Sequence, residues 1–415
     1  MSQFLKVRSA KQVMEILQRL EPLSEEAVRL EKACGRVLAV PVTASEPVPP
    51  FPRAIMDGFA VRAKDTFGAS ESLPALLEVA GEVVMGQPAV VSVTEGRAVA
   101  IPTGGMLPAG ADAVIMVEYT SPLDETSIEV TRPVAPGENV LGAGDDMKEG
   151  EAVFPEGWRL RPQDLGVLAA LGITSVRVHR QPRVAILSTG DEVVPASIQS
   201  LPPGKIRDIN TYTLAAELEQ AGALVGETLL VKDDPHELVS RCRRCLEDHD
   251  VLVLSGGSSV GMRDFTVRIL EGFEDAELLA HGVAVRPGKP TILATVGGKL
   301  FWGLPGQPVS ALMICRTFVV PSIRILQNHC KGLRGDGGQT CTARLIRKIP
   351  SASGRTDLFP VVLRPEGATL RAEPVFGKSA MISTLGQADG YIVIPEDAEG
   401  LDGDTEVTVH LFTSS

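Results

Sequence analysis

Apolar and polar residues alternate with two different periods along the middle of the chain. Between residues 182 and 325, short apolar runs typical of buried strands alternate with stretches in which apolar residues recur every three or four positions, as in helices. Strands are expected at 184–188, 224–231, 251–254, 284–285, 291–294 and 300–302. Helices are expected at 211–221, 235–247, 264–270 and 309–325. This alternation predicts a mostly parallel sheet covered by helices on both faces.

The first 180 residues show a less regular pattern. Helical spacing predicts a helix after Ser9, a second helix over residues 27–33 after Ser24, and a third over 162–171. A proline-rich segment at 41–52 follows the second of these and predicts an extended connection between domains.

The remaining regions carry the signals of β structure. Residues 53–148 contain short aliphatic runs separated by Gly, Pro and Asp, and alternating Val and Ile return after residue 330. Strands are expected at 76–80, 97–101, 113–117, 127–130, 175–179, 340–348, 358–363 and 407–411.

The chain is therefore predicted to be an α/β multidomain protein with a central three-layer α/β/α domain. A β-rich insertion domain, an elongated mixed domain and a C-terminal β-barrel-like domain accompany it. The expected boundaries are 1–48 with 149–180 for the elongated discontinuous domain, 49–148 for the insertion, 181–328 for the α/β domain and 329–415 for the C-terminal domain.

The composition of the chain excludes several classes of protein and partner. The 415 residues exceed one ordinary domain, and a net charge of −12 argues against nucleic acid as the main partner. No run of 18 uncharged apolar residues and no signal-peptide pattern occur, so we expect no membrane span and a cytoplasmic location. Cys242 and Cys245 form a CxxC within a helical pattern, but without a second pair a zinc or redox role is disfavoured.

Polar loops follow four of the predicted strands. In an open parallel sheet the ligand lies beyond the carboxyl ends of the strands, near the point where the strand order reverses. Those ends are expected at 188–192, 232–234, 255–264 and 304–308. Loop 255–264 is rich in Gly and Ser and precedes a helix, so its backbone amides predict an anion site. The alternative is an ordinary strand–loop–helix turn.

Carboxylates stand in the same loops. Glu192, Asp233, Asp234 and Asp264 would repel a phosphate that the amides attract. Mg²⁺ resolves this conflict, because it binds hard oxygen ligands and bridges carboxylates to phosphate oxygens. We therefore infer a Mg²⁺-dependent phosphate ligand, with plain surface carboxylates as the alternative. Asp233 has a further alternative as the N-cap of the helix at 235.

A second cluster of charge lies in a rigid turn. Arg286 and Lys289 flank Pro and Gly residues that fix the backbone, and they suit a second oxyanion cradle. The alternative is a solvated hairpin. No nucleophile–His–Asp set stands out, so metal-assisted attack on a phosphate bond fits the residues better than covalent acyl chemistry.

These motifs closely resemble those of the molybdopterin molybdenumtransferases, the MoeA family, whose fold is also that of the gephyrin E domain. The resemblance spans nearly the whole chain in one order. The matching motifs are 55–61, 102–114, 137–146, 188–192, 255–264, 286–290, 304–310, 354–357 and 377–379.

The resemblance implies the last step of molybdenum cofactor assembly. Molybdate enters an adenylylated molybdopterin, and Mg²⁺-dependent hydrolysis of the adenylate releases AMP. It implies catalytic roles for Asp57, Thr103, Glu192, Asp234 and Asp264, and a metal site formed by Glu192, Asp233, Asp234 and Asp264. It implies a molybdate cradle of Arg286, Lys289, Ser310, Arg355 and Ser379. It implies a pterin–nucleotide site formed by Ser188, Thr189, Gly190, Ser255, Gly256, Gly257, Ser258, Gly261, Pro305 and Gly306.

The resemblance also implies a homodimer in which the insertion domain of one chain, with Asp57, Thr103 and Asp146, closes the site of its partner. Transient contact with the adenylyltransferase and with acceptor molybdoenzymes is expected, without nucleic acid or membrane. Adenylyl transfer onto the pterin and a non-catalytic, gephyrin-like scaffold are the alternatives, and tungstate is an alternative oxyanion. Ala54 and Leu141 depart from the Ser and Arg common in the family, and Arg286 stands where Lys is usual.

Overall fold

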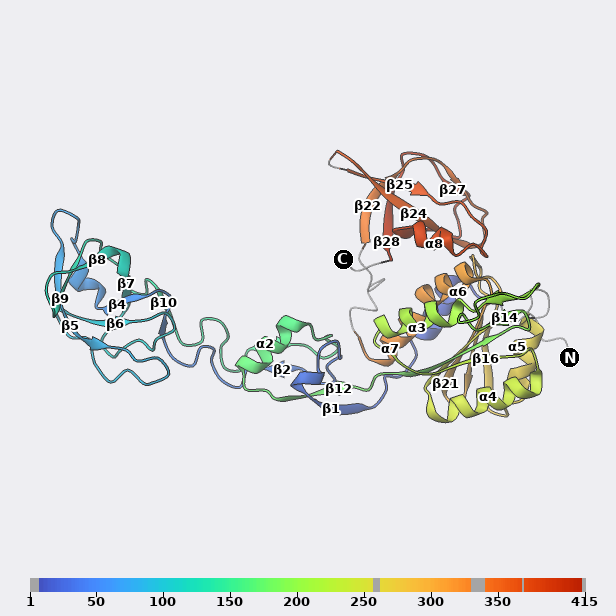
Figure 1. Ribbon diagram of the computed structural model, residues 1–415, viewed down its shortest axis with the longest axis horizontal. Coiled ribbons are helices and arrows are strands. Elements are labelled where there is room, and N and C mark those ends of the chain that lie inside the picture. The colour runs from blue at the N-terminus through green and yellow to red at the C-terminus, as the bar shows by residue number, and fades with distance from the viewer. Residues whose placement is uncertain (1–6, 257–261, 330–339, 368, 413–415) are drawn as a thin grey trace. The chain divides into compact units, whose positions relative to one another are not determined.

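The computed structural model describes residues 7–256, 262–329, 340–367 and 369–412 (Figure 1). The chain forms two compact units. One comprises residues 1–40, 156–161 and 175–415, and the other comprises residues 41–155 and 162–174. The four domain boundaries expected from the sequence stay a prediction.

The first unit is built around a six-stranded sheet. Its order is β16 (Leu224–Val231), β13 (Arg183–Thr189), β17 (Val251–Gly256), β21 (Lys299–Leu304), β20 (Ile292–Val296) and β18 (Ala276–His281). The first four strands are parallel and the last two are antiparallel, which confirms a mostly parallel sheet. The strand order reverses between β13 and β17, where Ser188 pairs with Ser255 and Thr189 with Gly256. The carboxyl ends at the switch point are therefore adjacent, as the sequence predicts.

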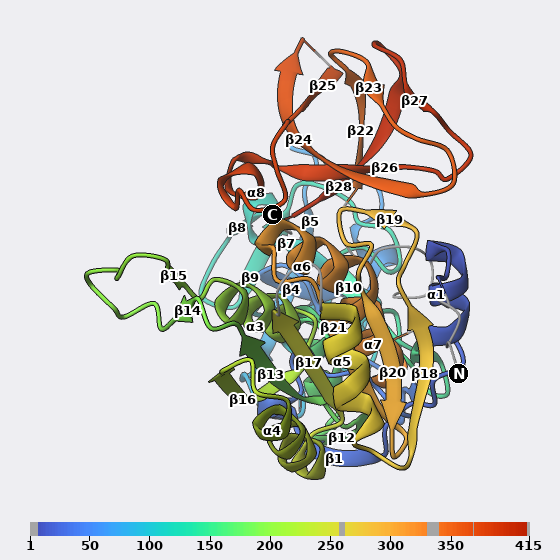
Figure 2. The ribbon, with the colours of Figure 1, turned by 90° about the vertical axis from the view of Figure 1, so that its right-hand side faces the viewer.

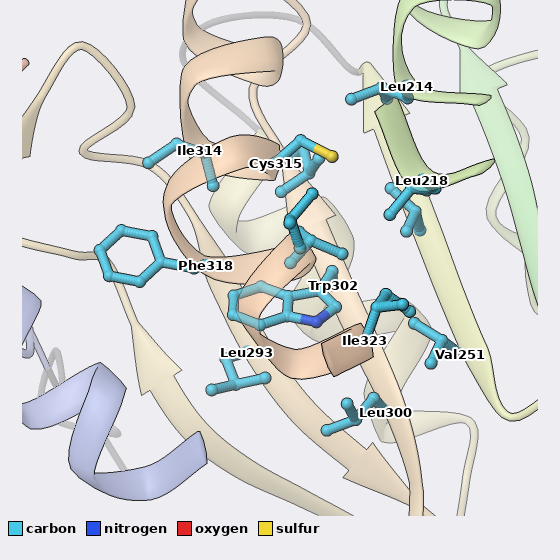
Figure 3. Close-up of a cluster of buried hydrophobic side chains, with 14 of the residues drawn as sticks. Leu214, Leu218, Val251, Leu293, Leu300, Trp302, Ile314, Cys315, Phe318 and Ile323 are labelled. Atoms are coloured by element: carbon cyan, nitrogen blue, oxygen red, sulfur yellow. The ribbon is translucent and has the colours of Figure 1, made fainter. Parts of the chain in front are cut away.

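Helices cover both faces of this sheet. One face packs against α1 (Ala10–Leu17), α3 (Asn210–Gln220), α6 (Pro308–Ile314) and α7 (Val320–Leu326), and the other against α4 (Pro235–Asp248) and α5 (Met262–Glu271). Successive side chains of a strand point to opposite faces, so the neighbours Phe301 and Trp302 lie in different cores. Figure 3 shows Trp302 surrounded by aliphatic side chains and Phe318.

The helix expected at 309–325 is continuous but contains a π-helical turn at Cys315–Val319, between α6 and α7. By length and composition alone, Pro308–Leu326 could cross a membrane, with a mean hydropathy of 1.7. However, 72% of this stretch is buried within the protein. Packing against the sheet accounts for its apolar character.

The helix predicted over residues 27–33 is wrong. β1 (Glu25–Arg29) pairs antiparallel with β12 (Ser175–His179), and a 3₁₀ turn follows at Leu30–Lys32. Hydrogen bonds to a strand far along the chain outweigh the local helical spacing here, because that spacing carries no information about a distant partner. The helix after Ser9 is confirmed as α1, with Ser9 Oγ accepting from Gln12 N.

The C-terminal part of the first unit is a closed five-stranded barrel (Figure 2). Its strands close the ring in the order β24 (Thr356–Glu366), β25 (Thr369–Pro374), β22 (Thr340–Leu345), β28 (Glu406–Leu411) and β26 (Gly390–Ile394), which pairs back to β24. The short strand β19 (Val285–Arg286) runs parallel to β24 and joins the barrel to the sheet domain. The unit also contains β14 (Val193–Val194), β15 (Ile206–Arg207), β23 (Ile349–Pro350), β27 (Gly400–Leu401) and α8 (Ser383–Gln387).

The second unit is the predicted β-rich region. Its six-stranded sheet runs β7 (Ala113–Met116), β4 (Gly58–Val61), β6 (Arg97–Ile101), β5 (Ala75–Glu82), β9 (Ser127–Val130) and β8 (Thr120–Pro122). Gly58 allows β4 and β7 to approach, since a Cβ there would lie 1.8 Å from the Ile115 carbonyl oxygen. Two small ladders and one helix complete it, namely β3 (Arg53–Ala54) with β10 (Val140–Leu141), β2 (Val42–Thr43) with β11 (Ala152–Phe154), and α2 (Pro162–Ala170).

Candidate functional site

A cavity of about 1480 Å³ lies in the first unit, at the carboxyl ends of β13, β17 and β21. The turn 286–290 and the barrel segments 352–360 and 375–380 complete its lining. Small-molecule sites usually measure about 300–1,000 Å³. The cavity therefore has room for an extended ligand with two chemically different ends.

One end of the cavity is lined by strand termini. Ser188, Thr189 and Ser255 are almost fully buried, and their hydroxyl groups stand where β13 and β17 end. Ser188 Oγ lies 2.9 Å from Thr211 Oγ1, at the start of α3. Of the residues expected to bind a pterin–nucleotide, six line the cavity: Ser188, Thr189, Ser255, Gly256, Pro305 and Gly306.

Of the other four expected residues, Gly190 alone belongs to the described part of the chain. Gly190 follows β13 outside the lining, and a Cβ there would lie 2.8 Å from Val193 Cγ2, so glycine permits the tight turn before Glu192. Gly257, Ser258 and Gly261 lie outside the described residues.

Asn210 is a lining residue that sequence reasoning missed. Its Nδ2 donates to Ser255 Oγ at 2.8 Å and to the Gly306 carbonyl oxygen at 2.9 Å. Its Oδ1 is buried and has no partner among the described residues. Because a carbonyl oxygen can only accept, the contact with Gly306 fixes which way the amide points. The pair of polar residues Asp208 and Asn210, just before the predicted helix at 211, was the available signal.

The acidic residues are placed differently from one another. Glu192 lines the cavity, and Asp233 accepts a hydrogen bond of 2.6 Å from Thr189 Oγ1. Asp234 instead caps α4, accepting from Glu237 N at 2.9 Å. The alternative in which Asp233 caps this helix is therefore wrong, since the cap is Asp234. Asp264 lies in the first turn of α5, and its side chain is outside the described residues.

These donors suit a hard cation in type. Asp233 offers carboxylate oxygens beside the Thr189 hydroxyl, and Glu192 lines the same cavity as Ser188; such oxygen donors are the ligands that Mg²⁺ prefers. Within the described part of the chain, no three His, Cys, Asp or Glu side chains gather closely enough to hold a metal. Any such site therefore needs ligands from the substrate, or from the segment that contains Asp264.

A second group of lining residues, the cationic end, carries positive charge. All five residues of the expected oxyanion cradle line the cavity: Arg286, Lys289, Ser310, Arg355 and Ser379. Ser379 donates its hydroxyl to Gln307 Oε1, and its carbonyl oxygen accepts from Val309 N, so barrel and sheet domain meet here.

Two further charged residues of this end were not predicted. Lys378 lines the cavity beside Ser379. Asp357, which is almost fully buried, accepts from Arg355 Nε at 2.8 Å and forms an ion pair with Arg286. The sequence signal for Asp357 was its place in the 354–357 motif.

Asp57 and Thr103 lie together in the second unit. Thr103 N donates to Asp57 Oδ1 at 2.7 Å, and hydrogen bonds from Thr103 lower the pKa of that carboxyl group. The neighbouring side chains of Ile55 and Met56 are 45% and 41% exposed. Asp146 is also exposed. These two of the five expected catalytic residues thus share one surface loop cluster.

The two departures from the family pattern in this unit lie on the β3–β10 ladder. Ala54 is 1% exposed and pairs with Val140, while Leu141 is half-buried and pairs with Arg53. Ala54 thus packs in the interior of the unit.

The CxxC pair has no sign of redox or metal chemistry. Cys242 and Cys245 are buried between α4 and the sheet, and burial raises the pKa of each thiol to about 12. A reactive cysteine needs a lowered pKa and solvent access. Cys242 therefore acts as a small apolar side chain in the core, and Cys245 packs there while its Sγ donates to Glu227 Oε2 at 3.5 Å.

Comparison with known proteins agrees with this architecture. Three sequence families match in order: the MoeA N-terminal region (domain I and II) at residues 6–172, a probable molybdopterin binding domain at 185–325, and the MoeA C-terminal region (domain IV) at 342–412. Fold, cavity and these matches define a multidomain protein of molybdopterin biosynthesis.

Whole-chain relatives identify the family. A molybdopterin molybdenumtransferase of Staphylococcus epidermidis is 30% identical over 389 residues, covering 94% of this chain and 91% of that protein. A crystal structure of a molybdopterin biosynthesis MoeA protein from Pyrococcus horikoshii is 32% identical with a TM-score of 0.82, covering 98% of this chain and all of that one. The chain belongs to the MoeA family, and it is an enzyme of molybdenum cofactor biosynthesis.

Proposed function

We propose that the cavity binds adenylylated molybdopterin and molybdate together, and that the enzyme inserts molybdenum while the adenylate is hydrolysed and AMP is released. Water adds to phosphorus, and the phosphoanhydride P–O bond between the pterin phosphate and AMP breaks. The observation that carries the proposal is a single cavity lined both by buried hydroxyl groups at strand ends and by the cationic side chains of the turn 286–290 and the barrel. An oxyanion and a phosphoanhydride would thus be held side by side in one cavity.

Each end has a proposed task. Ser188, Thr189 and Ser255 hold the pterin–nucleotide through their hydroxyl groups. Arg286 and Arg355 hold molybdate, because guanidinium groups present several donors in a plane to an oxyanion. Binding both substrates in fixed orientation accounts for much of the rate gain of such a reaction.

We propose Mg²⁺ as the cofactor, held by Glu192, Asp233 and Asp264, with Asp234 as a further candidate. The carboxylate and hydroxyl oxygens around Thr189 support this choice. When bound, Mg²⁺ would supply positive charge that neutralises phosphate oxygens. Asp264 is proposed to act directly on the hydrolysis.

Adenylyl transfer onto the pterin and a scaffold role are less well supported. The molybdopterin molybdenumtransferase of Staphylococcus epidermidis matches over 91% of its own length, barrel and insertion included. Glu192, which lines the cavity, and Asp233, which accepts a hydrogen bond from the lining residue Thr189, argue against a purely structural role. Tungstate, which has nearly the size and charge of molybdate, is a second candidate oxyanion.

We further propose a cytoplasmic homodimer in which Asp57 and Thr103 of one chain complete the site of the other. Their hydrogen bond and the exposed apolar side chains of Ile55 and Met56 beside them support a contact surface. Transient contact with the adenylyltransferase and with acceptor molybdoenzymes would pass the labile pterin along.

The test is direct. Purified protein is incubated with adenylylated molybdopterin, Mg²⁺ and either molybdate or tungstate, and AMP release and metal content of the pterin are measured. We expect AMP and metal-loaded pterin in equal amounts, and neither without an oxyanion. Formation of adenylylated pterin from ATP and molybdopterin would support the adenylyl-transfer alternative instead. Binding without any turnover would support the scaffold alternative.

A further inference from the structure

Asp357 lies between the two arginines of the cationic end. Its Oδ1 accepts from Arg355 Nε at 2.8 Å and its Oδ2 from Arg355 Nη2 at 3.4 Å. The same Oδ2 lies 3.8 Å from Arg286 Nη1. The Asp357 side chain is 3% exposed, whereas that of Arg286 is 63% exposed. One buried carboxylate therefore contacts two guanidinium groups at the cavity wall.

Strand pairing produces this arrangement. Arg286 is directly opposite Asp357 in the parallel pair β19–β24, and Arg355 immediately precedes β24. The turn 286–290 belongs to the sheet domain and Arg355 to the barrel, so their arginines come from distant parts of the sequence. Asp357 is the group that both of them share.

We propose that Asp357 is the positioning residue for oxyanion binding, and that it orients Arg286 and Arg355 without touching the substrate. A guanidinium has five N–H donors. Asp357 engages one edge of Arg355 and one terminal nitrogen of Arg286, which leaves the remaining donors for the ligand. The ligand class is a tetrahedral dianion such as molybdate, so this inference rests on the proposed function of the cationic end.

A positioning role of Asp357 and a purely Coulombic effect of its charge predict opposite changes in anion affinity. By Coulomb attraction alone, removing the negative charge of Asp357 would strengthen the binding of an anion nearby. If Asp357 instead fixes the arginines, its loss frees two long side chains, and the ligand must then pay the entropy of ordering them. The sign of the change in affinity therefore separates the two roles.

The test compares Asp357→Asn with Asp404→Asn. Asp404 also contacts two arginines of the same barrel, Arg371 at 2.6 Å and Arg344 at 3.4 Å, but it lies outside the cavity. Affinity for molybdate alone is measured by calorimetry, and adenylylated molybdopterin binding is measured separately. We expect Asp357→Asn to weaken molybdate binding about tenfold or more, as loss of charge-assisted hydrogen-bond geometry does, with no change for the pterin–nucleotide. Asp404→Asn is expected to change neither.

A second variant keeps the test decisive if Asp357→Asn fails to fold. Asp357→Glu keeps the buried negative charge but shifts the carboxylate by one methylene, so it disturbs the contacts with Arg355 and Arg286 without removing charge. We expect weaker molybdate binding from this variant as well, and unchanged binding would count against the positioning role. In turnover, Asp357→Asn should raise the KM for molybdate more than it lowers kcat.

Unchanged or tighter molybdate binding in Asp357→Asn would overturn the inference and leave the proposed function intact. Absence of AMP release from the wild-type enzyme would overturn the proposed function. The difference in molybdate affinity between the wild type and Asp357→Asn, measured by calorimetry, would still decide the role of Asp357.

Discussion

Thr189 donates its hydroxyl to Asp233 at 2.6 Å, at the carboxyl end of β13. The adjacent Asp234 uses its carboxylate as the N-cap of α4. Two neighbouring acids of one loop are therefore bound to different parts of the fold. Asp233 borders the cavity through Thr189, and Asp234 holds the start of a helix.

Substitutions of Asp233 and Asp234 should therefore have different effects. Asp234→Ala should lower the free energy of unfolding by about 1 kcal/mol, the usual cost of losing an N-cap, and Asp234→Ser should restore it. Asp233→Asn should leave stability nearly unchanged but reduce AMP release. Urea unfolding and an AMP assay measure the two effects. Loss of AMP release in the stable Asp234→Ser variant would show that Asp234 is also catalytic.

Asp264→Ala should retain pterin–nucleotide binding and lose AMP release, because we propose that this carboxylate acts on hydrolysis. Glu271→Ala at the far end of α5 is the matched control and should behave as the wild type. Binding is followed by fluorescence of the pterin and hydrolysis by chromatography of AMP. Unchanged AMP release would remove Asp264 from the mechanism.

Asn210→Ala should weaken pterin–nucleotide binding about tenfold, since Asn210 orients Ser255 at the cavity wall. With Nδ2 donating to Ser255 Oγ, the serine hydroxyl proton is free to point toward the ligand. Ser255→Ala should have a similar effect, and the double variant should add little. Additive losses in this double-mutant cycle would mean that the two residues act independently.

Mixing Asp57→Ala with Asp264→Ala should restore part of the activity that each variant lacks, because mixed dimers would contain one intact site. Each variant is purified alone, combined, and allowed to exchange subunits before AMP release is measured. A mixture no more active than its components, in a protein shown to be dimeric by light scattering, would place Asp57 in the site of its own chain.

Asp250 should make stability depend on acid pH. Burial raises its pKa, but a two-point contact with Arg180, with both distances 2.8 Å, and a hydrogen bond from Arg183 N outweigh this and hold the pKa below the usual value. A lowered folded-state pKa gives stability that is present above the unfolded-state value and is lost as the pH falls through the folded one. Asp250→Asn should therefore be destabilised at pH 7, with a difference from wild type that shrinks below about pH 4. A constant difference would contradict this.

The periodicity of the sequence was sufficient to predict many of the strands. The apolar run at 251–254 and the alternation at 127–130 form strands at those positions. Whether one or both faces of a strand are buried determines the pattern of apolar residues at neighbouring positions, so the sequence alone reveals it. The same reasoning placed Ser188, Ser255 and Gly306 near each other, since parallel strands bring their carboxyl ends to one edge.

Only the tertiary structure decided what depends on distant partners. Residues 27–29 form a strand because β12 lies beside them. Asp233 accepts from Thr189, which lies 44 residues earlier in the chain, whereas Asp234 caps α4. Asp357 joins Arg286 to Arg355 because β19 pairs with β24. Local spacing records which face of an element is apolar, but it does not record which strand from elsewhere in the chain will provide the hydrogen bonds, and that pairing sets the geometry of the charged end of the site.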